Sequence, residues 1–254
     1  MMPVSGLVLC ALFGFASQAA PLSFEVASIG PNRGPWHVLH GFSFSGPTLT
    51  LEGYTLFDLV TEAYKLKNYQ LMLSGPVPRT VAYDTYYNVV AKAEGDRTPT
   101  KSEFRQMLQT LLAERCNLEV HREMKEIPVY ALVVGKNGPK FKESAAEANW
   151  VSNHGVNGRN QTITLVKAAM ESLADDIQGS FGVDRPVVDK TGLTGAYTIK
   201  LEATPERVSS RGDAEPGELS VFTAVQEQLG LRLESQRAQI EILVVDHIDK
   251  PSAN

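Results

Sequence analysis

Thr48–Ala63 reads TLTLEGYTLFDLVTEA, and Thr162–Ile177, 114 positions further along, reads TITLVKAAMESLADDI. Both stretches open with a Thr and an aliphatic residue in alternation, the period-2 pattern of a strand with one buried face. An apolar stripe at spacing i, i+3, i+7 follows in each, which is typical of a helix lying on a sheet. Its members are Leu56, Leu59 and Ala63 in the first stretch and Met170, Leu173 and Ile177 in the second. The sequence therefore predicts the same strand and helix twice.

Two further pairs of segments repeat in the same order, which indicates an internal duplication. The alternating run at Tyr87–Ala93 returns at Tyr197–Ala203, and Gly75-Pro76-Val77 aligns with Arg185-Pro186-Val187 at the same offset of 110. At an offset of 113, two short period-2 runs joined by a polar connection recur, and each pair predicts a hairpin that closes its copy. These runs are Leu118, Val120, Ile127 and Val129, and then Leu231, Leu233, Ile240 and Ile242.

A helix is expected before each hairpin. Thr100 and Glu103 form a capping-box pattern ahead of an apolar stripe that starts at Phe104, and Ser220–Leu229 carries a similar stripe. Each copy thus reads β-α-β-α-β-β. This order predicts an α+β protein of two duplicated units, with antiparallel or mixed sheets covered by helices.

The expected domain boundaries follow from these repeats. Residues 20–135 hold the first unit together with an additional strand at Phe24–Ile29, which we expect to join one of the sheets. A Gly-, Asn- and Lys-rich stretch, 136–158, is interpreted as a linker loop, and residues 159–254 form the second unit. Thr204–Glu218 is interpreted as a loop inserted into the second unit.

The N-terminal segment has the composition of a secretory signal. Residues 1–23 contain no charged side chain, and the apolar run Val4–Ala16 is followed by small residues, so we expect a signal peptide at 1–19 with cleavage after Ala19. A membrane anchor is the alternative, although the run is shorter than the ~20 residues of a spanning helix, and no stable span is expected after cleavage. The product is expected outside the cytoplasm, in the periplasm or the medium. Cys116 is then the only thiol, and we expect it to be buried and inert.

Composition limits the classes of partner. Of the 254 residues, 43% are hydrophobic and 21% charged, as in ordinary globular proteins. The net charge is −5, with 24 basic against 29 acidic side chains, which gives no electrostatic footprint for nucleic acid. Nucleic acid is therefore not an expected partner.

The segment Asp189–Thr194 (DKTGLT) is the first candidate site. It resembles the phosphorylated-aspartate signature of cation pumps, and its KTG resembles a box of penicillin-recognising enzymes, but neither chemistry has its other parts in this chain. A turn with Gly192 and Gly195 at special backbone positions explains it more simply. Because a charge pair and two glycines let a ligand approach the backbone, Asp189, Lys190 and Thr191 are also candidate binding residues.

Histidines and carboxylates supply the remaining candidates. His37 and His40 have H-x-x-H spacing but no third ligand at a recognisable distance, so no metal or other cofactor is predicted. His121 and Glu123 share the outer face of a predicted strand, either as a solvated face or as binding residues. Asp175 and Asp176 are interpreted as ordinary solvent-facing residues of a helix.

Several segments together resemble a known family. They include Phe24–Ile29, His121-Arg122-Glu123 with Pro128–Val134, Gly138-Pro139-Lys140, Val187–Gly195 and Leu243–Asp246. Their order is similar to that of the soil-associated family of unknown function expanded in Acidobacteria. The resemblance implies export and, through fusions to membrane metallopeptidases of the antibiotic-sensor type, sensing or binding. One departure is Gly30, which stands before Pro31 where the family usually has Lys.

The expected function is a non-enzymatic binding or sensing module with an unidentified ligand or protein partner outside the cytoplasm. The alternative is an extracellular hydrolase, with His121, Glu123 and Asp189 as acid–base candidates. That alternative requires the three side chains to meet in a concave pocket.

Overall fold

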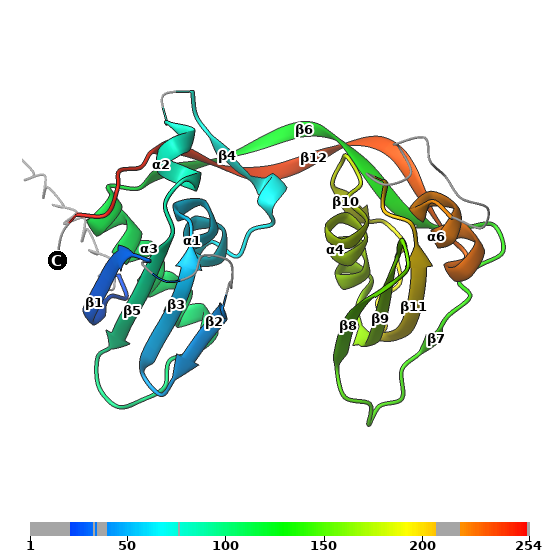
Figure 1. Ribbon diagram of the computed structural model, residues 1–254, viewed down its shortest axis with the longest axis horizontal. Helices are drawn as coiled ribbons and strands as arrows, with labels where there is room; N and C mark the ends of the chain where they lie inside the picture. The colour runs from blue at the N-terminus through cyan, green and yellow to red at the C-terminus, as the bar shows by residue number, and fades with distance from the viewer. Residues whose placement is uncertain (1–20, 33, 35–39, 76, 207–218, 253–254) are drawn as a thin grey trace, which may run out of the picture. The chain divides into compact units, whose positions relative to one another are not determined.

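The structure is a computed structural model that describes residues 21–32, 34, 40–75, 77–206 and 219–252. The expected signal peptide 1–19, His37, the side chain of His40 and most of the expected insertion lie outside the described residues. The described chain forms two compact units (Figure 1). One unit contains the residues up to His121 together with those from Leu243 onward, and the other is Arg122–Ile242.

The first unit is a four-stranded antiparallel sheet packed against two helices. Its strand order is β1-β5-β3-β2 (Figure 1). The prediction that the first strand joins a sheet is confirmed, because β1 pairs with β5. The elements of this unit are β1 (Phe24–Pro31), β2 (His40–Ser45), β3 (Thr48–Tyr54), α1 (Leu56–Ala63), η1 (Asn68–Gln70), β4 (Leu71–Leu73), α2 (Arg79–Tyr83), β5 (Tyr87–Ala93) and α3 (Lys101–Cys116).

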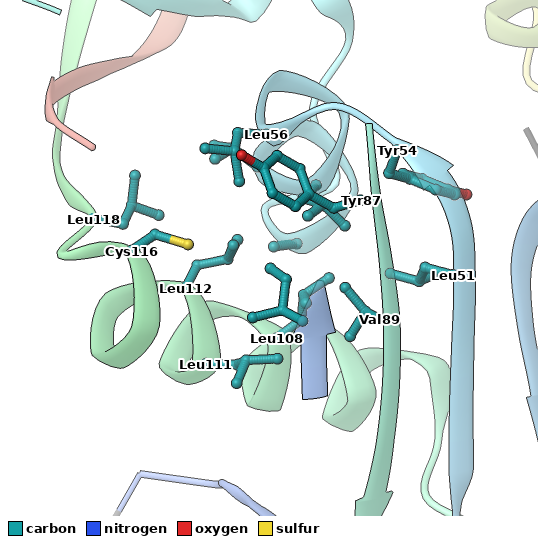
Figure 2. Close-up of a cluster of buried hydrophobic side chains, with 14 of the residues drawn as sticks. Leu51, Tyr54, Leu56, Tyr87, Val89, Leu108, Leu111, Leu112, Cys116 and Leu118 are labelled. Atoms are coloured by element: carbon teal, nitrogen blue, oxygen red, sulfur yellow. The ribbon is translucent and has the colours of Figure 1, made fainter. Parts of the chain in front are cut away.

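Alternation along the strands builds the core of this unit. Leu51 and Val89 point from β3 and β5 toward Leu108 and Leu112 of α3, and all four are fully buried (Figure 2). Cys116 lies in the same cluster, as predicted, and burial raises its pKa to about 12. Its thiol is therefore protonated and unreactive at neutral pH.

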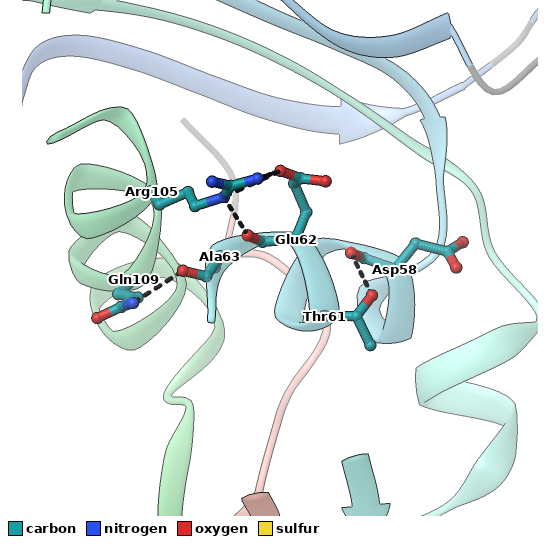
Figure 3. Close-up of polar contacts among 6 residues, drawn as sticks. All are labelled: Asp58, Thr61, Glu62, Ala63, Arg105 and Gln109. Atoms are coloured by element: carbon teal, nitrogen blue, oxygen red, sulfur yellow. Dashed lines mark hydrogen bonds and ion pairs between the residues drawn. The ribbon is translucent and has the colours of Figure 1, made fainter. Parts of the chain in front are cut away.

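Polar side chains of α3 fix the end of α1 (Figure 3). Arg105 Nε donates to the backbone carbonyl of Glu62 at 3.1 Å, while its Nη2 lies 2.7 Å from Glu62 Oε1. Gln109, one turn further along α3, donates to the carbonyl of Ala63 at 2.8 Å. Carbonyls at a helix C-terminus have no partner inside the helix, so these bonds satisfy them and lock the two helices together.

The second unit repeats the arrangement of the first. Its sheet has the order β7-β11-β9-β8, again with antiparallel neighbours, and it packs with two helices. Its elements are β7 (Lys142–Glu143), β8 (Val151–Asn157), β9 (Asn160–Ala168), α4 (Met170–Phe181), β10 (Val187–Asp189), β11 (Tyr197–Ala203) and α6 (Val221–Leu229). Interpreting 136–158 as a loop was wrong for β7 and β8, whose polar residues pair with β11 and β9.

A shared irregularity strengthens the correspondence between the units. The register between β3 and β5 shifts between Leu51 and Tyr54, and that between β9 and β11 shifts between Leu165 and Ala168. In both bulges one residue has a positive φ, Gly53 at 71° in the first unit and Lys167 at 56° in the second. A lysine rarely adopts a positive φ. That Lys167 adopts it at the position that corresponds to Gly53 indicates that the two units share one backbone conformation. The duplication itself stays a prediction.

A third sheet corrects the predicted hairpins. β6 (Glu119–Val134) and β12 (Leu231–His247) are single long strands, and they lie side by side in the order β10-β6-β12-β4. The polar stretches interpreted as hairpin connections instead pair with each other. β6 then runs parallel to β10, and β12 runs parallel to β4, so each long strand begins in one unit and ends in the other.

This pairing also overturns one alignment made from the sequence. β4 pairs with β12 as β10 pairs with β6, so β4 is the counterpart of β10. Val77 follows β4, whereas Val187 opens β10, and the two are not equivalent. The sequence misled here because α2 follows β4 in the first unit, whereas a short turn follows β10 in the second.

The expected α+β class is confirmed by these antiparallel and mixed sheets with their packed helices. In the described part of the chain, no helix has the length and apolar character needed to cross a membrane.

The two units differ at one helix cap, which gives a matched test. Thr55 caps α1 by accepting from Asp58 N at 3.1 Å, whereas Ala169, with nearly the same backbone angles, gives α4 no side-chain cap. We expect Thr55→Ala to lower the free energy of unfolding by about 1 kcal/mol and Ala169→Ser to raise it by about 0.5–1 kcal/mol. Urea denaturation measures both. Equal and negligible effects would contradict the assigned caps.

Candidate functional site

His121 and Glu123, two of the predicted site residues, lie on β6 and make polar contacts at the surface. His121 Nδ1 is 2.6 Å from Asp246 Oδ2 on β12, and both side chains are about half exposed. Glu123 lies 3.7 Å from Lys125 Nζ on its own strand. Each charged side chain therefore has a partner on the ribbon.

The middle of β6 and β12 forms a two-stranded ribbon exposed on both faces. Arg122 pairs with Glu241, and Arg237 pairs with Glu126, in both cases across the two strands. Exposed ion pairs of this kind add little to stability, but opposite charges across neighbouring strands favour one register over others. The contacts account for these charges as a solvated strand face.

The Asp189–Thr191 turn is held by bonds within itself. Asp189 Oδ1 accepts from the backbone N–H of Thr191 at 2.9 Å and from its hydroxyl at 2.8 Å, while Lys190 N–H donates to the carbonyl of Leu132. Gly192 has a φ of 70°, and a Cβ on Gly195 would lie 2.7 Å from the Tyr197 hydroxyl oxygen. The structural explanation thus accounts for both glycines and for the Asp189 carboxylate, and Lys190 keeps an exposed side chain.

The three acid–base candidates of the hydrolase hypothesis have separate partners. His121 belongs to the first unit and Asp189 to the second. His121 pairs with Asp246, and Asp189 with its own turn. Neither of the two hollows described below is lined by these residues or by Glu123. The geometry gives this set of residues no support as a catalytic site.

A polar cluster around His154 was missed by the sequence analysis. His154 Nδ1 lies 3.0 Å from the Ser180 hydroxyl, and its Nε2 lies 3.1 Å from the Ser152 hydroxyl and 3.6 Å from Asp176 Oδ1. Asp176 was interpreted as an ordinary solvent-facing residue, but its side chain is only 21% exposed and faces β8. Burial raises the pKa of Asp176, and the neighbouring His154 offsets part of that effect.

The cluster has the residue types of a serine hydrolase without the required geometry. In such a triad the carboxylate hydrogen-bonds one ring nitrogen and the serine the other. At 3.6 Å, Asp176 is beyond hydrogen-bond distance, and Ser152 already contacts that nitrogen. Ser180 also lies in the last turn of α4, where the helix dipole disfavours a developing oxyanion. The cluster serves to hold β8 against α4.

A hollow of about 420 Å³ beside the C-terminus of α6 has a different character. Arg232 Nε is buried there and has no hydrogen-bond partner among the described residues, although Nη2 of the same side chain contacts Glu234. Lys140 Nζ donates to the carbonyl of Glu227 at 2.7 Å. The hollow is lined by Gly135, Lys136, Asn137, Lys140, Gln226, Glu227, Gly230 and Arg232.

Two glycines allow the backbone to form this hollow. Gly135 N–H donates to the carbonyl of Gly230 at 2.8 Å, which brings the 135–140 loop onto the end of α6. Gly230 has a φ of 68°, and a Cβ there would lie 2.1 Å from the carbonyl oxygen of Gly138. Only glycine at position 230 is compatible with this contact.

A second hollow, of about 460 Å³, is lined by Asn160, Lys200, Glu202, Leu219 and Gln228, and three of these polar residues are held by hydrogen bonds. Gln228 exchanges two hydrogen bonds with the backbone of Glu202, and Asn160 contacts Glu202 and Thr204. The first hollow differs in being lined by Arg232, whose buried Nε has no hydrogen-bond partner among the described residues. No group of three or more His, Cys, Asp or Glu side chains suited to a metal ion occurs in the described ranges.

The fold defines a two-unit α+β protein, and a polar hollow lies beside the C-terminus of α6. The family model for a protein of unknown function, DUF3738, matches residues 57–248, and the chain belongs to this family. The predicted resemblance to a family of unknown function is thus confirmed, while its link to soil bacteria and Acidobacteria stays a prediction. Neither the curated proteins nor the solved structures contain a match.

The glycine contact at the hollow makes a testable difference. Gly230→Ala introduces both a left-handed alanine and a clash with the Gly138 carbonyl, whereas Gly182→Ala, at a φ of 63°, meets no atom within 4 Å. We expect Gly182→Ala to cost about 1 kcal/mol and Gly230→Ala at least ~2 kcal/mol more in unfolding free energy. Urea denaturation of both variants checks this. Equal losses would show that the loop does not press on α6.

Proposed function

We propose that the protein is an exported, non-enzymatic binding module whose ligand is a small anion, of the carboxylate or phosphate class, held in the hollow beside the C-terminus of α6. The single observation that carries the proposal is Arg232 Nε, a buried donor without a partner among the described residues. A buried donor without an acceptor costs about 1–3 kcal/mol, which an anionic oxygen would recover.

The surroundings of the hollow favour the same ligand class. Lys136, Lys140 and Arg232 line the hollow together with the carboxylate of Glu227, and Glu234 pairs with Arg232 from outside the lining, within a chain whose net charge is −5. Asn137 and Gln226 add amide groups that donate or accept. The lining contains no histidine, serine or cysteine, and its charged groups are suited to recognition of an anion.

Export is proposed from the N-terminal sequence. The uncharged segment with the apolar run Val4–Ala16 and small residues up to Ala19 supports secretion into the periplasm or the medium. In that setting a binding module meets ligands imported or released by the cell. The turn at Asp189–Thr191 is a second proposed contact surface, and the exposed Lys190 is the group available to a partner.

Binding is tested with citrate and inorganic phosphate as probes. We expect either anion to raise the melting temperature and to shift the amide resonances of Gly135–Lys140. We expect Arg232→Gln to weaken this binding by about tenfold, the effect of losing one charge-assisted hydrogen bond. Arg237→Gln is the matched control, since it removes an arginine of the same strand that already pairs with Glu126.

Two outcomes would overturn the proposal. One is the absence of any shift at Gly135–Lys140 with both probes at millimolar concentration. The other is an equal loss of binding in Arg232→Gln and Arg237→Gln, which would indicate attraction by overall charge.

A further inference from the structure

β8 is an edge strand without the usual protection against strand pairing. In the order β7-β11-β9-β8, one side of β8 bonds to β9, and no described strand pairs with its other side. The strand has seven residues in continuous register, and its sequence, VSNHGVN, contains no charge and no proline. Natural edges of this kind are normally blocked by charges, prolines or bulges.

The other edge strands of these two four-stranded sheets show those protections. β1 carries a register shift near Phe24, a charged Glu25 and a final Pro31. β2 shifts register between His40 and Ser43, and β7 has two residues, both charged. The unprotected edge of β8 thus contrasts with its counterparts in the same molecule.

Two large apolar side chains flank this edge. Trp150, immediately before β8, is 66% exposed, and Val156 near its end is 77% exposed. Alternation along a strand places Trp150, His154 and Val156 on the same face of the sheet. This face is the one covered by α4, because His154 contacts Ser180 of that helix. Trp150 and Val156 lie three residues on either side of Asn153.

This spacing is self-complementary. If a second copy of β8 lies antiparallel with Asn153 opposite Asn153, Trp150 of each copy faces Val156 of the other, an aromatic and β-branched pair of the kind that stabilises sheets. Apolar groups on the two copies therefore meet complementary partners.

The backbone fits this register as well. Asn157 and Asn160 are the pair that closes the turn between β8 and β9. Along β8, the backbone N–H and C=O groups that bond to β9 are therefore those of Val151, Asn153, Gly155 and Asn157. The backbone N–H and C=O groups of Ser152 and His154 then point to the open edge. In the proposed register, Ser152 of one copy lies opposite His154 of the other. Asn153 would sit in the close, non-hydrogen-bonded pair at the centre.

We propose that β8 is a homodimer interface, in which two copies join their sheets edge to edge with Asn153 on the two-fold axis. The partner is a second copy of this chain, because the spacing of Trp150 and Val156 about Asn153 complements itself along an uncharged edge. This inference is independent of the anion site, which lies on the loop after β6.

Cysteine cross-linking tests the register. Across a non-hydrogen-bonded pair the Cα atoms are about 4.5 Å apart, within the range of a disulfide. We expect oxidised Asn153→Cys to form a covalent dimer. Asn157→Cys is the matched control on the same face, since the register pairs position 157 with position 149 and separates the two new cysteines by more than ~20 Å. The native Cys116 is buried and does not interfere.

Light scattering tests the interface without new cysteines. We expect the unmodified chain to be a dimer and Val156→Lys to shift it to a monomer, because a charge would face Trp150 of the other copy. Val26→Lys, at a valine that is 65% exposed on the edge strand β1, is expected to stay dimeric. Circular dichroism confirms that both variants are folded. A monomeric unmodified chain, equal effects of the two lysines, or efficient cross-linking of Asn157→Cys would overturn the proposal.

Discussion

The pairing of β6 with β12 is the interaction on which the rest of the structure depends. Each strand starts after a helix of one unit and ends beside a short strand of the other. At its end, β12 supplies Leu243 and Val245 to the first core, and β6 supplies Leu132 to the second. The first core therefore needs two separate pieces of chain, whereas the second is built within the continuous segment Arg122–Ile242. Backbone groups that would be unsatisfied in either strand alone are paired in the ribbon, and its crossed ion pairs select the register.

This exchange explains why the charged residues of the ribbon are structural. A strand exposed on both faces cannot be held by burial, so Arg122, Glu126, Arg237 and Glu241 pair across it instead. The His154 cluster and the Asp189 turn likewise use their polar groups in local bonds. The hollow at Arg232 stands apart because a buried donor there has no partner among the described residues. Recognition of an anion is the chemistry that we propose for this arrangement.

The sequence predicted the elements that have one buried face. Strict alternation at Tyr87–Ala93 and Tyr197–Ala203 gave both strands with their observed bounds, and the stripes of α1, α3, α4 and α6 gave the helices. The prediction failed in strands along which buried and exposed residues do not alternate. The middle of the ribbon is polar on both faces and was interpreted as hairpin connections, and the polar edge strand β8 was interpreted as a loop.

The site residues were harder to predict because their contacts are distant in the chain. His154 meets Ser180 across 26 positions, and the hollow joins the loop after β6 to the end of α6. Gly230 was a readable signal, since a glycine directly after a helical stripe indicates a left-handed C-cap. Nothing in the sequence shows that the cap also receives another loop.

Hydrogen exchange on a chain truncated after Ile242 tests the reciprocal exchange of strands most directly. The truncation removes the part of β12 that pairs with β4 and packs in the first core, while the second unit keeps all of its strands. The account predicts that amides of β3 and β5 lose their slow exchange, whereas those of β9 and β11 keep it. Unchanged protection of β3 and β5 would contradict it, because the first unit would then be complete without the strand from its neighbour.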